Sequence, residues 1–264
     1  MRVGLDLSIT AFNAAGNARY ARCLEAALAA GGDLELVRFE LPAALRASAA
    51  GARRKALVLY WEFVYAPALL PLLARRARVD LLHCPLPMPV GAPGCPLVVT
   101  ALDAIPALFP HWFTPAMGLR LRRWLRLGVL AADALITISN RTADDLRRLF
   151  PGLSTPVYPV LLGSFLDAAA AGPAAAGPPY LLCVGTLEPR KNLARAIEAY
   201  ALLARARPDL PRLVVVGGQG WGDVNLVQLA AQHGVADRVE LAGFLSDADL
   251  GALYAGAELL IYPS

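Results

Sequence analysis

The hydrophobic pattern of the chain alternates between short apolar runs and longer segments with helical spacing. The runs are rich in leucine and valine and are apolar throughout, which is typical of parallel strands covered by helices on both faces. This alternation predicts an α/β chain. The predicted strands are RVGLDL (2–7), LELVRF (34–39), ALVLYW (56–61), VDLLHC (79–84), PLVVTAL (96–102), ALITIS (134–139), PVYPVLL (156–162), YLLCVG (180–185), RLVVVGG (212–218), VELAGF (239–244) and ELLIYP (258–263).

Helical segments lie between many of these strands. Tyr20, Leu24 and Leu28 form one apolar stripe after the first strand. Ser139 or Asn140 is the expected N-cap of one later helix, because both side chains accept hydrogen bonds from a first helical turn. The further predicted helices cover 115–131, 142–150, a segment that begins at Asn192, a segment near 224–233, and one that begins at Ser246, which with Asp249 resembles a capping box.

One segment interrupts the alternation. Residues 167–179 read DAAAAGPAAAGPP, a low-complexity stretch with no pattern that packs, and this composition predicts a linker. We therefore expect a Rossmann-like domain over 1–166 and a second, smaller Rossmann-like domain over 180–264. Each is predicted to be a doubly wound parallel sheet.

Composition indicates a buried α/β chain in a reducing compartment. Hydrophobic residues make up 57% of the chain and the mean hydropathy is +0.48, but no apolar run reaches the roughly 18 residues of a spanning helix. The longest, 63–74, contains two prolines. Strand-like sequence follows Met1-Arg2 directly, without a signal peptide, and the four cysteines form no C-x-x-C pair. We expect a cytoplasmic protein with reduced thiols.

The net charge of +4 is unevenly distributed. Residues 1–150 hold 18 lysines and arginines against 11 aspartates and glutamates, whereas residues 151–264 hold 7 against 10. A basic first half and a mildly acidic second half indicate two domains that face different partners.

Candidate chemistry lies in residues 184–193, VGTLEPRKNL. A strand breaks at Gly185, and the turn that follows places Arg190 and Lys191 directly before a helix that begins at Asn192. The helix start supplies backbone N–H groups and a partial positive charge, and the two side chains supply full charges. This arrangement indicates a phosphate site, and the alternative is a solvated turn with two surface cations.

The same ten residues resemble the signature of the retaining glycosyltransferases of family 4, which have the GT-B fold. The resemblance implies two Rossmann-like domains that face each other across a cleft, with the nucleotide-sugar donor mainly on the second and the acceptor mainly on the first. It also implies that Arg190 and Lys191 bind the donor diphosphate, as the catalytic groups that stabilise charge on it, with Gly185 and Thr186 beside them.

Other segments are similar to the same family. AAGNARYARCLEAAL resembles its glycine-bearing loop and following helix, which implies donor contacts by Gly16 and Asn17 and a place in the cleft for Arg19. VVTALDAIPALFP resembles the segment around V-T-I-H-D. Asp103 is present there as a cleft residue, but Leu102 stands where relatives carry a histidine near the donor sugar, and this departure bears on sugar choice and activity.

In the second half, VVVGGQGWGD (214–223) lacks the third glycine of a G-x-G-x-x-G fingerprint, which argues against NAD. It resembles a glycine turn of family 4 instead, which implies that Gly218 contacts the donor. The segment around Phe244 and Leu245 resembles the part of the family that receives the nucleobase. For Phe244 the alternative is a core aromatic at a strand end.

A second departure is the end of the chain at Ser264. In the family, a strand like LLIYPS leads into a glutamate-rich loop that contacts the donor ribose and sugar. The sequence therefore reads as a C-terminally truncated member with an incomplete second domain.

The segment GLRLRRWLRLGVL (118–130) has two interpretations. Arginines alternate with leucines and a tryptophan, which favours a helix lying on an anionic membrane; the alternative is a helix packed on the sheet with its arginines in water. Nucleic acid is not an expected partner, because the basic residues lack a recognisable module.

Together these observations predict a hexosyltransferase that moves a mannosyl- or glucosyl-type group, with retention, from a nucleotide-diphosphate sugar to a glycan or lipid-linked hydroxyl in surface polysaccharide synthesis. The predicted location is the cytoplasm or the inner face of the membrane. No metal or other cofactor is expected, because cations and helix ends supply the positive charge. The alternative is a non-catalytic, nucleotide-binding remnant of such an enzyme.

Overall fold

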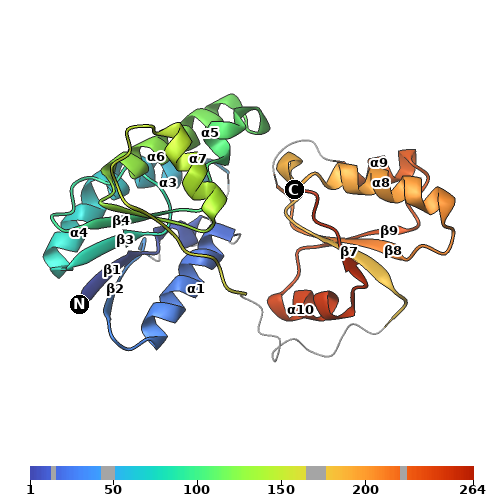
Figure 1. Ribbon diagram of the computed structural model, residues 1–264, viewed down its shortest axis with the longest axis horizontal. Helices are drawn as coiled ribbons and strands as arrows, with labels where there is room; N and C mark the ends of the chain where they lie inside the picture. Colours follow the sequence, from blue (N-terminus) through green and yellow to red (C-terminus); the bar gives the residue numbers. More distant parts are fainter. Residues whose placement is uncertain (13–15, 43–50, 165–176, 221–224) are drawn as a thin grey trace. The chain divides into compact units, whose positions relative to one another are not determined.

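The computed structural model describes residues 1–12, 16–42, 51–164, 177–220 and 225–264. The chain forms two compact units, Met1–Gly163 and Ser164–Ser264 (Figure 1). Most of the linker predicted over 167–179 falls outside the described residues, since these resume at residue 177.

The first unit is built on a parallel sheet with the strand order β2-β1-β3-β4-β5-β6. The chain passes from β1 to β2 on one side and then to β3 on the other, so the order reverses beside β1. In such doubly wound sheets, ligands bind at the carboxyl ends of the strands near the reversal. The strands are β1 (Arg2–Asp6), β2 (Glu35–Phe39), β3 (Leu81–Cys84), β4 (Leu97–Ala101), β5 (Ala134–Thr137) and β6 (Val157–Pro159).

Helices cover both faces of this sheet. Leu5 and Leu7 contact Ala21 of α1 on one face, and the larger cluster on the other face joins the strands to α4 and α6. The helices are α1 (Gly16–Ala30), α3 (Gly51–Tyr60), η2 (Trp61–Leu69), α4 (Leu70–Ala77), α5 (Ile105–Leu108), α6 (Pro115–Ala131) and α7 (Asn140–Leu149), with short 3-10 turns η1 (Ser8–Ala11) and η3 (Pro110–Trp112).

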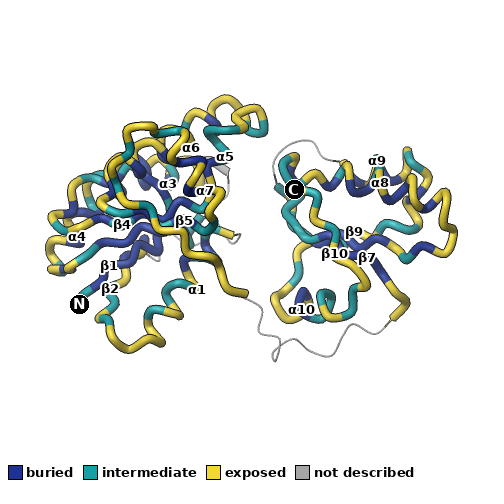
Figure 2. Tube along the Cα trace, in the orientation of Figure 1, coloured by how far each residue is buried: buried dark blue, intermediate teal, exposed yellow. Residues whose placement is uncertain are grey.

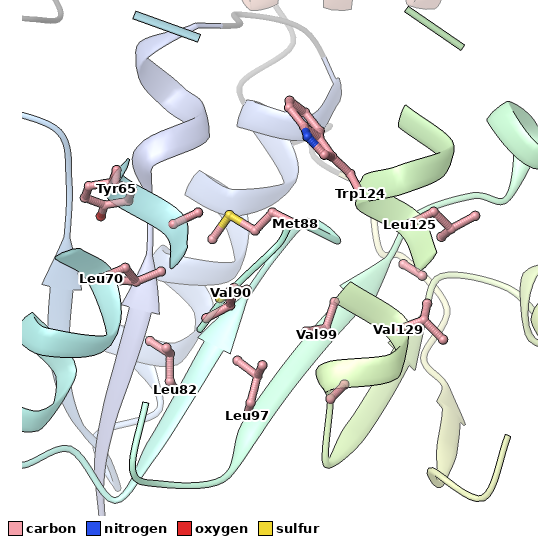
Figure 3. Packing of buried hydrophobic residues seen from close by; sticks show 14 of the residues in the cluster. Tyr65, Leu70, Leu82, Met88, Val90, Leu97, Val99, Trp124, Leu125 and Val129 are labelled. Atoms are coloured by element: carbon pink, nitrogen blue, oxygen red, sulfur yellow. The ribbon is translucent and has the colours of Figure 1, made fainter. Parts of the chain in front are cut away.

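The larger core cluster of the first unit lies between these helices and β3 to β5. Leu82, Leu97 and Val99 project from the sheet towards Met88, Trp124 and other apolar side chains (Figure 3). At Gly128 a Cβ would lie 2.7 Å from the Met88 backbone nitrogen, so α6 approaches this core more closely than any larger residue permits.

The strand predicted over 56–61 was wrong, because this segment is helical. α3 continues into η2, a stretch of π-helical hydrogen bonding, and then into α4. Leu57, Trp61 and Tyr65 recur every four residues and are all buried, which is the spacing of one helix face. Leu59, between them, is 54% exposed, so the run is apolar on all sides and its helical period is hidden.

The helical segment Arg53–Ala77 is the one part of the described chain with the length and apolar composition of a membrane-spanning helix. The sequence alone suggested none, because its apolar runs are interrupted. The side chains of Tyr65 and Leu70 are buried in the core cluster of the first unit (Figure 3), and Trp61 belongs to the same cluster. Packing against the sheet therefore accounts for the apolar composition of this face of the segment.

The second unit is a smaller parallel sheet with the order β10-β7-β8-β9. α8 and α9 cover one face through Ile197 and Leu226, and α10 covers the other through Leu250. The central strands β7 and β8 appear as mostly buried segments between these helices (Figure 2). The elements are β7 (Tyr180–Val184), η4 (Pro189–Lys191), α8 (Leu193–Ala206), β8 (Arg212–Val216), α9 (Leu226–Gln232), β9 (Val239–Gly243), α10 (Asp247–Gly256) and β10 (Leu259–Leu260).

Side-chain caps begin two helices where the sequence predicted them. Ser139, rather than Asn140, accepts a hydrogen bond from the Thr142 backbone nitrogen at 3.1 Å, so α7 starts one residue after it. Ser246 accepts from the backbone nitrogen of Asp249 at 3.2 Å and donates to its carboxylate at 2.6 Å. The N-cap predicted at Ser246 is therefore confirmed, but the Asp249 carboxylate bonds the serine hydroxyl where a capping box has the N-cap backbone N–H.

β10 forms one edge of the second sheet. Leu259 and Leu260 are 57% and 46% exposed.

Candidate functional site

Two loops meet at the carboxyl end of the second sheet, and their backbones are in direct contact. The Leu187 nitrogen donates to the Gly218 carbonyl at 3.0 Å, and the Gly220 nitrogen donates to the Leu187 carbonyl at 3.2 Å. A Cβ on Gly217 would lie 1.9 Å from the Gly185 carbonyl oxygen, and one on Gly220 would lie 2.7 Å from the Leu187 carbonyl. Only glycine fits at positions 217 and 220 without a backbone shift.

The turn after β7 carries the two predicted cations. η4 (Pro189–Lys191) is followed by Asn192 in the left-handed conformation, with φ 53°, and then by α8. No side chain of the described residues caps the first turn of α8. Its backbone N–H groups and its partial positive charge therefore lie beside Arg190 and Lys191, as an anion site requires.

Arg190 forms an ion pair with Glu188, a residue to which the sequence analysis gave no role. The Glu188 side chain is 1% exposed and the Arg190 side chain is 28% exposed. The buried Glu188 carboxylate pairs with Nε of Arg190 and offsets the charge of the guanidinium. A guanidinium carries five N–H donors, so one side chain can bind a carboxylate and a phosphate oxygen at the same time.

Lys191 reaches the other edge of the turn. A Cβ on Gly185 would lie 3.4 Å from its Cγ and Cδ atoms, so the lysine stem runs over that glycine. Its Nζ donates to the Tyr262 hydroxyl at 2.5 Å and lies 4.9 Å from the centre of the Tyr262 ring. Burial raises the pKa of the Tyr262 phenol, but hydrogen bonds from Lys191 and Ser264, together with the charges of Lys191 and Arg190, outweigh it and hold the pKa below its ordinary value.

Phe244 and Leu245 follow β9 at the same end of the sheet. Phe244 is 71% exposed, so the alternative of a core aromatic is wrong. A Cβ on Gly218 would lie 3.7 Å from Phe244 Cβ, which places the exposed ring beside the glycine loop. Leu245 instead packs against the apolar cluster under α10.

The structure thus brings together the residues that the sequence assigned to the second unit. Arg190, Lys191, Gly185, Thr186, Gly218 and Phe244 surround the two loops, with Leu245 directly below them. Gly217 was missed, although the G-G pair after a strand is a signal for close backbone approach. Tyr262 was missed because nothing in its local sequence indicates a contact with residue 191.

The residues predicted on the first unit occupy separate places. Gly16 and Asn17 begin α1, with Arg19 one turn along, and residues 13–15 of the preceding loop lie outside the described residues. Asp103 is exposed and accepts a hydrogen bond from the Ile105 backbone nitrogen at 3.1 Å, two residues along the chain, just before α5. Leu102 follows β4 as an apolar residue.

A buried polar network lies at the carboxyl ends of β1 and β3. The Asp6 carboxylate accepts from the Ser8 backbone and hydroxyl and from Tyr65, and burial raises its pKa to about 6. His83 Nε2 lies 2.8 Å from Thr100 Oγ1, and burial lowers the pKa of the imidazole to about 4. His83 is therefore a neutral, hydrogen-bonded core residue, as expected for a histidine in an apolar strand.

Two family models match the chain. The model described as Glycosyltransferase Family 4 covers residues 16–158, more than half of the chain. The chain belongs to glycosyltransferase family 4. The model described as Glycosyl transferases group 1 matches residues 167–264 of this family 4 chain, which include the two loops and both cations.

Known proteins agree with this family. The family 4 chain is 30% identical over 144 residues to O-antigen chain mannosyltransferase B of Escherichia coli, a match that covers 51% of this chain and 38% of that protein. Sucrose-phosphate synthase of Thermosynechococcus elongatus superimposes with a TM-score of 0.69 and 15% identity over 100% of this chain and 75% of that one. Anabaena Alr3699/HepE, solved with UDP, gives a TM-score of 0.63, with 19% identity over 100% and 74% of the two chains.

These structural matches establish the GT-B fold predicted from the sequence, with two parallel-sheet units of which the second is smaller. The match to the curated mannosyltransferase spans less than half of that protein's length.

Proposed function

We propose that this family 4 chain is a retaining hexosyltransferase whose donor is a nucleotide-diphosphate sugar. The observation that carries the proposal is the pair Arg190 and Lys191, placed beside the uncapped start of α8 and above two loops joined by glycine backbone. Backbone amides, a helix N-terminus and two cations at the carboxyl end of a sheet match the charge and size of a diphosphate.

In the proposed reaction, the bond between the anomeric carbon and the diphosphate oxygen breaks, and the acceptor hydroxyl oxygen forms the new bond on the same face. The acceptor proton passes to the departing diphosphate. Arg190 and Lys191 stabilise the negative charge that grows on this leaving group, and one such contact is typically worth about 3 kcal/mol. The segment of Phe244 and Leu245 is proposed to receive the nucleobase, with Gly218 beside it and Thr186 near the phosphates.

Neither a metal nor another cofactor is part of the proposal, because the cations and the helix start supply the positive charge. Within the described residues, no three His, Cys, Asp or Glu side chains are grouped to hold a metal ion. The sugar is proposed to be of mannosyl or glucosyl type, and the similarity to an O-antigen mannosyltransferase favours a mannosyl group. The proposed acceptor is a glycan or lipid-linked hydroxyl in surface polysaccharide synthesis. Gly16 and Asn17 are proposed to contact the donor, and Arg19 and Asp103 are the further candidate ligands on the first unit.

Calorimetric binding of GDP, UDP and ADP to the 264-residue chain tests the donor site. We expect one nucleotide to bind, and Arg190→Ala or Lys191→Ala to weaken it by roughly 10- to 100-fold, the range for a hydrogen bond to a charged group. Arg205→Ala, in the last turn of α8 and so at the far end of that helix, is the matched control and should bind normally. Equal affinity of all the variants would refute the assignment.

The second candidate function is nucleotide binding without transfer. It is favoured by Leu102, an apolar residue where the family resemblance implies a histidine. Release of nucleoside diphosphate from GDP-mannose and UDP-glucose separates the two candidates. If the wild-type chain releases no nucleoside diphosphate and the Leu102→His variant does, the result would favour nucleotide binding without transfer.

The proposed location is the inner face of an anionic membrane, reached through α6. Leu119 and Leu130 are 64% and 56% exposed on this helix, and Arg122 and Arg126 are exposed between them. Leucines that insert between headgroups and arginines that pair with anionic lipid are the features of an interfacial helix. Liposome flotation should show binding to anionic but not to neutral vesicles. Arg122→Glu/Arg126→Glu should abolish it, whereas Arg148→Glu on α7 should not.

A further inference from the structure

Tyr262 contacts Lys191 across a gap of about seventy residues in sequence. The Lys191 ammonium lies 2.5 Å from the Tyr262 hydroxyl and 4.9 Å from the ring centre. A second contact joins the same two segments, because the Asn192 side-chain nitrogen donates to the Pro263 carbonyl at 3.3 Å. The segment after β10 therefore holds the end of the turn that carries the two cations.

The register of the sheet explains this proximity. β10 pairs in parallel with β7, with Leu260 opposite Leu182, and the Ile261 nitrogen donates to the Leu182 carbonyl at 2.7 Å. The carboxyl ends of the two strands consequently lie at the same edge of the sheet. Residue 262 follows β10 at the level where the turn follows β7.

The Tyr262 ring is not needed to fill the core. It is 56% exposed, whereas its neighbour Ile261 packs against the apolar cluster under α8. An exposed aromatic ring with a hydrogen-bonded hydroxyl contributes little burial, so its clearest effect is on the cation that it touches.

We propose that Tyr262 is a positioning residue for Lys191. The Tyr262 hydroxyl holds the Lys191 ammonium in place over Gly185, where the ammonium binds a phosphate ligand. This inference rests on the proposed function of Lys191 as a diphosphate ligand. A free lysine side chain has many rotamers, and binding must select one of them. The Tyr262 hydroxyl accepts one of the three ammonium N–H bonds and leaves two for phosphate oxygens.

The contact also has a spectroscopic signature. Since the neighbouring Lys191 charge contributes to the lowered pKa of the Tyr262 phenol, replacement of the lysine by an uncharged residue should raise that pKa. A tyrosine whose hydroxyl does not contact the Lys191 ammonium in solution would show no such response.

The test compares Tyr262→Phe, Lys191→Ala and Tyr158→Phe with the wild-type chain. Tyr158 is 55% exposed on the first unit and serves as the matched control. Calorimetry should show that Tyr262→Phe weakens the preferred nucleoside diphosphate about tenfold, which is the loss of one hydrogen bond to a charged group, and leaves the corresponding nucleoside unaffected. Tyr158→Phe should bind both ligands as the wild type does.

An NMR titration of the Tyr262 ring carbon in wild-type and Lys191→Met chains provides the second measurement, which needs no nucleotide. We expect the phenol pKa to rise in Lys191→Met. An unchanged pKa, or wild-type diphosphate affinity in Tyr262→Phe while Lys191→Ala binds weakly, would overturn the positioning role alone. Failure of the wild-type chain to bind any of GDP, UDP and ADP would overturn the proposed function and this inference with it.

Discussion

Two buried groups in neighbouring strands should make opposite contributions to the pH dependence of stability. Asp6 ends β1, and His83 lies in β3 opposite Leu5. Burial raises the pKa of Asp6 from 3.8 to about 6, although hydrogen bonds from Ser8 and Tyr65 act against it. Burial lowers the pKa of His83 from 6.5 to about 4.

The signs follow from proton linkage. Between about pH 4 and 6 the folded chain keeps a proton on Asp6 that the unfolded chain has released, so this stability is present at low pH and is lost as the pH rises through 6. Over nearly the same range the unfolded chain protonates His83 and the folded chain does not, so that stability is present above pH 6.5 and is lost as the pH falls towards 4. Each shift of about two units corresponds to about 3 kcal/mol, and the two contributions nearly cancel.

Single substitutions should separate them. Asp6→Asn keeps an acceptor for Tyr65 and removes the titration, so its free energy of unfolding relative to wild type should fall by about 2 kcal/mol between pH 6.5 and 4. His83→Gln keeps a polar atom for Thr100 and should show the opposite change, a relative gain of about 2.5 kcal/mol over the same range.

Urea unfolding at constant ionic strength, followed by tryptophan fluorescence in a Trp221→Phe background, measures these differences. The remaining tryptophans, Trp61, Trp112 and Trp124, all lie in the first unit. Subtraction of the wild-type free energy of unfolding at each pH removes the contribution of the other carboxylates. For the double variant Asp6→Asn/His83→Gln, this difference should not change with pH. Difference curves that are flat for both single variants, or that slope in the same direction, would refute the reasoning.

Two further predictions concern the second unit. Gly217→Ala should lower the free energy of unfolding of the second unit by about 3 kcal/mol, because the new Cβ meets the Gly185 carbonyl. Gly152→Ala, in the first unit, is the control and should leave stability unchanged, since nothing lies within 4 Å of its new Cβ. Equal urea midpoints for Gly217→Ala and the wild-type chain would contradict the prediction. Ser246→Ala should cost about 1 kcal/mol by removal of the α10 cap, and a midpoint equal to that of the wild type would show that the cap is not stabilising.

Much of the fold could be predicted from the sequence, because local pattern and tertiary packing agree in most elements. The helix predicted over 115–131 is α6 with the same bounds, since Pro115 starts it and the apolar face of Trp124 and Val129 is continuous. The parallel strands were recognisable as short runs with apolar residues on both faces. The strand predicted over 56–61 was wrong although the same criterion was used for it. A run that is apolar on all sides is compatible with a strand and with a buried helix, so this pattern alone does not distinguish the two.

The candidate site was predictable only in part. Arg190 and Lys191 lie in one contiguous motif, and the exposed Phe244 follows a recognisable strand end. Glu188 and Tyr262 could not be assigned, because their roles depend on an ion pair and on a strand register that no local spacing encodes.

The contact between the Gly185 and Gly217 backbones bears on how the ten-residue motif at 184–193 can be used outside this protein. The position of its turn depends on glycines about thirty residues later and on the register of β10. A synthetic peptide with this sequence, or the motif grafted onto another strand and helix, would retain the charges and lose the surface that orients them. The motif is thus a marker by which the family can be recognised, and the smallest unit that would keep its geometry is the whole four-stranded sheet with its loops.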